Sequence, residues 1–137
     1  MSRYRILIGV MGVDQHENGA IAVARMLREA QMQVCDAGLF NTPESIVEKA
    51  LAEAADVIGI SCHSWEFEHY LPLLLRRLRD EGRDIPVVVG GSVLTPKDRE
   101  RLARLGVAAT FAAGSTPDEI VDSIRALARA RASERVQ

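Results

Sequence analysis

Residues 4–19 read YRILIGVMGVDQHENG, an apolar run that passes directly into a polar segment. The run Tyr4–Val10 is predicted to be a buried strand, and the helical spacing of apolar residues over 19–30 predicts a helix after it. The same alternation recurs four more times, with strands predicted at 32–36, 56–61, 85–89 and 108–111 and helices at 43–54, 66–81, 96–105 and 117–130. Short apolar strands separated by helices predict one α/β domain whose parallel sheet is covered on both faces.

The composition is that of an ordinary soluble domain. The chain has 137 residues, 47% hydrophobic and 26% charged, which is enough to build a core without disulfides or metal. A formal net charge of −2 gives no support for nucleic acid or an anionic membrane surface as a partner. No run approaches the ~20 apolar residues of a membrane span. The two cysteines make no CxxC pair, so we predict a cytoplasmic protein with reduced thiols.

Polar and small residues gather where the predicted strands end. Along the chain they are Asp14, Gln15, His16 and Gly19; Ser61, Cys62 and His63; Gly90, Gly91 and Ser92; and Gly114, Ser115 and Thr116. Because the carboxyl ends of parallel strands meet at one edge of a sheet, we expect these residues to form one ligand site. The glycines would let backbone approach a ligand closely, and the apolar strand ends could accept a flat, mostly apolar body.

The pair Asp14 and His16 carries the most specific chemistry of this group. Proteins orient a metal-ligating histidine by giving its second ring nitrogen a carboxylate partner. The spacing therefore predicts one histidine presented to one metal centre.

The motifs resemble those of the cobalamin-binding domain of adenosylcobalamin-dependent mutases, in which DxHxxG is followed by SxL and then GG. Here the matching segments are Asp14–Gly19, Ser61–His63 and Gly90–Gly91. Residues 39–44 also resemble the small subunits of acyl-CoA mutases of the methylmalonyl-CoA and 2-hydroxyisobutyryl-CoA types. The resemblance implies a flavodoxin-like (Rossmann-like) five-stranded parallel sheet of order 2-1-3-4-5 over residues 1–132. Residues 133–137 are expected to form a frayed polar tail.

By matching position, the resemblance implies that His16 is the lower axial ligand to the cobalt of adenosylcobalamin. His16 would replace the cofactor's own base, and Asp14 would accept a hydrogen bond from its other ring nitrogen. Gln15 belongs to the same cofactor-binding segment.

The resemblance also implies a path for the displaced nucleotide tail. Gly19 would let the tail pass between sheet and helix, Ser61 and Gly90–Gly91 would line its groove, and Gly114–Thr116 would lie near the buried benzimidazole. The neighbouring Cys62, His63 and Ser92 are placed in the same cofactor site.

The function implied is that of the cofactor-binding small subunit of a heteromeric acyl-CoA mutase, an isomerase that rearranges carbon skeletons by radical chemistry. A large barrel-type subunit would hold the acyl-CoA, so this chain is expected to contain no catalytic residue and to be inactive alone.

Several features depart from the family pattern, and two alternatives stay open. His63 stands where SxL has leucine, and Trp65 lies in the altered loop after it. One alternative is a cobalamin-binding carrier or sensor without mutase activity, although such proteins usually bring a preceding helical module that we do not expect here. The other is a divergent relative that no longer binds cobalamin.

Overall fold

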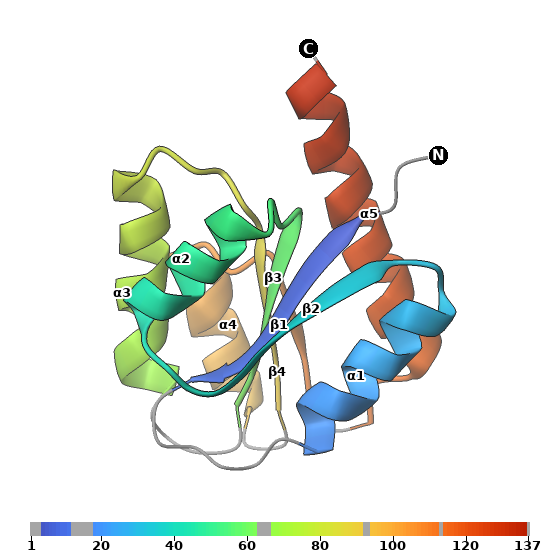
Figure 1. Ribbon diagram of the computed structural model, residues 1–137. Coiled ribbons are helices and arrows are strands. Elements are labelled where there is room, and N and C mark those ends of the chain that lie inside the picture. The colour runs from blue at the N-terminus through green and yellow to red at the C-terminus, as the bar shows by residue number, and fades with distance from the viewer. Residues whose placement is uncertain (1–3, 12–17, 63–66, 92–93, 113, 137) are drawn as a thin grey trace.

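The computed structural model describes residues 4–11, 18–62, 67–91, 94–112 and 114–136. Its elements, in chain order, are β1 (Arg5–Met11), α1 (Asn18–Glu29), β2 (Gln33–Asn41), α2 (Pro43–Ala52), β3 (Val57–Ser61), α3 (Phe67–Asp80), β4 (Val87–Gly90), α4 (Pro96–Leu105), β5 (Ala109–Phe111) and α5 (Pro117–Val136). The strands form one parallel sheet of order β2-β1-β3-β4-β5 with helices on both faces (Figure 1). The predicted α/β fold and strand order are confirmed.

Each face of the sheet carries its own hydrophobic core. Alternate residues of a strand point to opposite faces, so Ile58 of β3 packs with α2, α3 and α4 while Val57 packs with α1 and α5. Both residues are fully buried, as expected for a parallel strand that is covered on both sides. Within the described part of the chain, no helix has the length and apolar character needed to cross a membrane.

Two elements run further than the sequence predicts. Strand β2 continues to Asn41 rather than ending at Asp36, and its pairing with β1 shifts register twice on the way. Helix α5 continues to Val136 rather than Ala130, so residues 133–136 belong to α5. Arg131, in the part of α5 beyond Ala130, makes a tertiary contact. Its Nη1 lies 3.6 Å from the buried carboxylate of Asp56.

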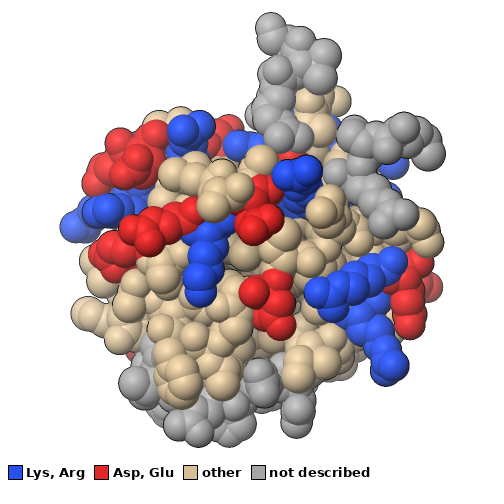
Figure 2. All heavy atoms as spheres, in the orientation of Figure 1, with Lys and Arg blue, Asp and Glu red and all other residues tan. Residues whose placement is uncertain are grey.

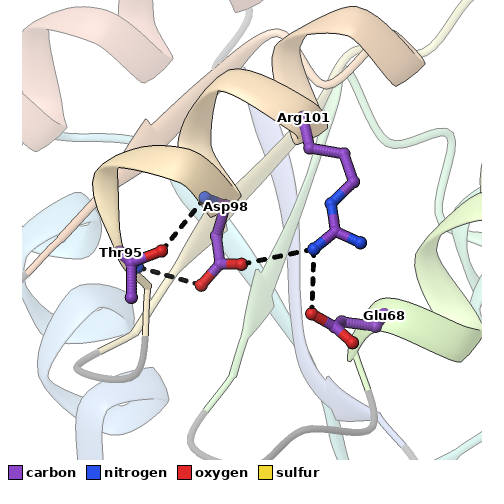
Figure 3. Close-up of polar contacts among 4 residues, drawn as sticks. All are labelled: Glu68, Thr95, Asp98 and Arg101. Atoms are coloured by element: carbon purple, nitrogen blue, oxygen red, sulfur yellow. Dashed lines mark hydrogen bonds and ion pairs between the residues drawn. The ribbon is translucent and has the colours of Figure 1, made fainter.

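Helix α4 begins with a capping box that is also tied to α3 (Figure 3). Thr95 Oγ1 accepts a hydrogen bond from the Asp98 backbone N–H at 3.1 Å, and the Asp98 carboxylate accepts one from the Thr95 N–H at 3.0 Å. Arg101 then bridges Asp98, at 3.6 Å, and Glu68 near the start of α3, at 3.1 Å. The two helices that follow β3 and β4 are therefore joined near their first turns.

This capping box predicts a pH-dependent contribution to stability. The hydrogen bond from the Thr95 backbone lowers the pKa of Asp98 below its ordinary value. A carboxyl whose pKa is lower in the folded than in the unfolded chain stabilises the fold above the unfolded pKa, and this contribution is lost as the pH falls through the folded pKa. We therefore expect Asp98→Asn to lower the free energy of unfolding near pH 7, with a smaller difference from wild type at about pH 3. Urea unfolding of both proteins at the two pH values measures this, and a difference that does not change with pH would contradict it.

Candidate functional site

The candidate site begins on the sheet face that packs against α1 and α5. Strand register aligns Ile8, Gly59 and Val88 in one row across β1, β3 and β4. A second row lies two residues further toward the carboxyl ends of β3 and β4. It consists of Ser61, Gly90 and Phe111 across β3, β4 and β5. In each row a glycine lies between larger residues, so the sheet surface is hollowed along these two rows.

A cavity of about 140 Å³ lies over this hollow. Its sheet side is formed by the two rows, and its other wall is formed by α1 and α5. The helical lining residues are Gly19, Ala20, Val23, Ile120 and Ile124. Apolar groups dominate the lining, while Ser61 and Ser115 supply hydroxyls. Such a site favours a flat apolar ligand that carries a few polar groups.

Gly59 keeps the floor of the cavity open. A Cβ placed on Gly59 would lie 2.5 Å from Ile8 Cδ1 and 3.6 Å from Val88 Cγ2. Glycine inside a strand weakens the sheet, and it often marks a place where a ligand approaches the backbone. The position of Gly59 between two lining side chains fits that second use.

Gly91 brings the ends of β3 and β4 together. A Cβ on Gly91 would overlap the backbone carbonyl oxygen of Cys62. The same two strand ends are joined by a hydrogen bond from the Cys62 N–H to the Gly90 carbonyl at 2.7 Å. Only glycine permits this approach, which closes the carboxyl edge beside the cavity.

The structure brings together five of the residues that the sequence places in the site. Lining the cavity are Gly19, Ser61, Gly90, Gly91 and Ser115.

Three other predicted residues are placed differently. Cys62 is buried in the core on the opposite face of the sheet and is not among the described residues that line the cavity. Thr116 Oγ1 accepts a hydrogen bond from the Glu119 N–H at 3.2 Å and caps α5. Gly114, with φ of +94°, makes the turn before that cap, a left-handed conformation that favours glycine.

The remaining predicted site residues, Asp14, Gln15, His16, His63 and Ser92, lie outside the described part of the chain. The expectations for them therefore stay predictions. Residues 12–17 connect the end of β1 to the start of α1, and residues 63–66 connect β3 to α3. The segments that carry these predicted residues thus adjoin described elements that line the cavity.

Most of the apolar lining is not among the site residues that the sequence predicts. Ile8, Gly59, Val88, Ile120 and Ile124 resemble ordinary core residues in the sequence. One signal was available, since Gly59 interrupts an otherwise branched apolar strand, Val57–Ile60. The face on which these residues meet depends on register between strands, which a single sequence does not give.

On the visible face of the molecule (Figure 2), the charges of the described residues give no comparable indication of a second site. On the face shown in Figure 2, lysines and arginines lie beside aspartates and glutamates, without a broad surface of one sign. Among the described residues, no three histidine, cysteine or acidic side chains gather as a metal-ligand set.

The chain is similar to known proteins over nearly its whole length. The family model of the B12 binding domain matches residues 4–127. The chain is 36% identical to the 2-hydroxyisobutanoyl-CoA mutase small subunit of Aquincola tertiaricarbonis, over 93% of each chain. It is 35% identical to the pivalyl-CoA mutase small subunit of Xanthobacter autotrophicus, over 96% of this chain and 88% of that one. Methylmalonyl-CoA mutase of Escherichia coli is 36% identical over 90% of this chain, which corresponds to 17% of the longer protein.

Solved structures support the fold. A cobalamin-binding protein from Desulfitobacterium hafniense superposes with a TM-score of 0.78 at 20% identity, covering 91% of this chain and 59% of that one. The receiver domain of the response regulator NarL from Mycobacterium tuberculosis gives a TM-score of 0.72 at 19% identity, covering 94% and 98%. At such identities the likeness concerns the fold alone.

Proposed function

Because the chain belongs to the B12-binding domain family, we propose that it is the small subunit of a heteromeric acyl-CoA mutase and binds adenosylcobalamin for it. Two small subunits of acyl-CoA mutases match nearly its whole length, which supports this role over that of an isolated carrier. In this proposal a large subunit, expected to be of the barrel type, holds the acyl-CoA.

The cavity between the sheet and helices α1 and α5 carries the proposal. The nucleotide tail of cobalamin ends in dimethylbenzimidazole, a flat and mostly apolar base. The apolar lining fits such a base, the missing Cβ of Gly59 leaves room for it, and the hydroxyls of Ser61 and Ser115 suit the polar part of the tail. Gly19 on the helical wall, and Gly90 and Gly91 on the sheet side, let a ligand approach the backbone closely.

His16 is the proposed cobalt ligand, with Asp14 as the partner of its second ring nitrogen. Both residues belong to the segment that leaves β1 at Met11, one strand away from the cavity floor at Gly59. A carboxylate partner fixes the tautomer and orientation of a ligating imidazole and raises its basicity.

When bound, adenosylcobalamin supplies radical chemistry through cleavage of its cobalt–carbon bond. The contribution of this chain is to bind the cofactor, hold its tail away from the cobalt and orient the corrin toward the partner subunit. No residue of the chain is assigned a role on the substrate, so the subunit is expected to be inactive alone.

Mixing the purified protein with adenosylcobalamin tests the proposal. We expect the absorption spectrum of the base-off, histidine-ligated cofactor with wild type, and its loss in His16→Ala. An unchanged spectrum of the free cofactor with wild-type protein would contradict the proposal. A matched control is His69→Ala, since His69 lies on α3 with its ring 5.0 Å from that of Tyr70.

A second measurement separates a mutase subunit from a carrier or sensor. We expect the cofactor-loaded protein to bind an acyl-CoA mutase large subunit and to confer isomerase activity on it. Cofactor binding with no such complex would favour the carrier or sensor.

A further inference from the structure

The end of β2 is irregular where it lies beside the end of β1. Gly9 pairs with Gly38 and Met11 with Asn41, so a single β1 residue stands opposite two residues of β2. Gly38 has φ of +76° and Phe40 has φ of +59°, a left-handed conformation that is unfavourable for a residue other than glycine. Such a segment persists only where surrounding contacts hold it in place.

Asn41 supplies those contacts. Its side chain is 1% exposed, and its Nδ2 donates to the carbonyls of Val10, Ala37 and Gly38 at 3.1, 3.2 and 2.9 Å. Its Oδ1 accepts hydrogen bonds from Ser45 Oγ at 3.0 Å and from Lys49 Nζ at 2.9 Å.

Lys49 reinforces the same network from α2. Its Nζ also donates to the Ala37 carbonyl at 2.9 Å, so one ammonium group contacts both Asn41 and the irregular part of β2. Hydrogen bonds in which one partner is charged are stronger than neutral ones, which makes this junction of β1, β2 and α2 well defined.

Among these contacts, the bond to Val10 is the one that reaches β1. Val10 has no partner in the register of β1 with β2, and the Asn41 amide donates to its carbonyl instead. Met11 follows and ends the strand, and the chain then enters the segment that carries Asp14 and His16. Asn41 thus fixes the backbone position from which that segment leaves the sheet.

We propose that Asn41, supported by Lys49, is a positioning residue for the cobalt-ligating segment. The inference rests on the proposed function, because it assigns His16 to cobalt. Asn41 belongs to the edge strand β2 and lies outside the cavity lining. In this inference its side chain acts on His16 through the backbone of β1.

The test uses Asn41→Asp, which preserves the shape of the side chain. Aspartate still accepts from Ser45 and Lys49, but it has no N–H to donate to the Val10 carbonyl. We expect the Kd for adenosylcobalamin to rise about tenfold and the histidine-ligated fraction of the spectrum to fall. Cobinamide, a corrinoid without the nucleotide tail, should lose affinity by a similar factor, because the defect lies on the histidine side of the site.

Lys49→Met is the second variant, in case Asn41→Asp folds poorly. It removes the two Nζ hydrogen bonds, and its side chain reaches the surface. Because the ligating segment would then be only partly less well oriented, we expect the Kd to rise about two- to threefold. The matched control is Asp56→Asn. Asp56 directly precedes β3, at the amino ends of the strands. Asp56 is also buried, and its Oδ2 accepts from the Arg5 N–H at 2.9 Å, so this variant should lose stability without changing the spectrum or Kd.

The outcomes separate this inference from the proposed function. If wild type binds with a histidine-ligated spectrum and both variants match it, the positioning role is overturned while the function stands. An equal loss of affinity in Asp56→Asn would also overturn it, because the effect would then follow stability alone. If wild type gives no histidine-ligated spectrum, both are overturned.

Discussion

Gly59→Val is expected to weaken cobalamin binding by roughly 100-fold or more without unfolding the protein. The new side chain would enter the cavity from its floor, between Ile8 and Val88. An aromatic body buries about 150 Å² of apolar surface, which at about 25 cal/mol/Å² contributes ~4 kcal/mol. Losing most of that contribution raises the Kd by two to three powers of ten, at about 1.4 kcal/mol each.

Cobinamide distinguishes a blocked tail site from general damage. Because it lacks the nucleotide tail, its affinity should be similar for wild type and Gly59→Val, whereas cobalamin affinity falls. Titrations followed by absorption give both values. Gly59→Ala is the milder comparison, since its Cβ would be crowded only by the movable end of Ile8 and would make ordinary contacts with Val88 Cγ2 and the Leu7 carbonyl oxygen. An equal loss for both corrinoids would mean that the cavity does not hold the tail.

Gly91→Ala is expected to lower the free energy of unfolding by about 3 kcal/mol, the upper end of the usual range for overpacking. Its Cβ would overlap the Cys62 carbonyl oxygen, and that atom belongs to backbone held by the bond between the Cys62 N–H and the Gly90 carbonyl. Neither strand end can yield as a side chain would, so β3 and β4 must separate at the carboxyl edge. Chemical denaturation measures the loss.

The neighbouring glycine is the matched control for Gly91. A Cβ on Gly90 would lie 3.5 Å from the Phe111 carbonyl oxygen and 3.7 Å from Phe111 Cβ, which are ordinary contacts. We expect Gly90→Ala to change the free energy of unfolding by less than about 1 kcal/mol. Equal destabilisation by the two substitutions would show that the contact with Cys62 is not the cause.

The sheet was predictable from the sequence because each strand is a short apolar run with a helix after it. That pattern is local, and it placed β1, β3 and β4 within a few residues of their observed ends. It also placed Gly19, Ser61 and Gly90 at one edge, where the cavity lies.

The features that escaped prediction depend on contacts between distant residues. The hollow at Gly59 exists because Ile8 and Val88 are its neighbours in register, far away along the chain. The length of β2 depends on Asn41 and Lys49, and α5 reaches across to Asp56 through Arg131. Periodicity reports which face of one element is apolar, and it does not report such pairings.

The irregular end of β2 has a further consequence for the behaviour of the protein at high concentration. β2 is an outer strand of the sheet, and outer strands offer unpaired backbone groups to which a strand of another molecule can add. Two register shifts and the left-handed backbone at Gly38 and Phe40 interrupt the even spacing that such addition requires. The other outer strand, β5, is only three residues long. The sheet is thereby protected at both margins against growth into aggregates.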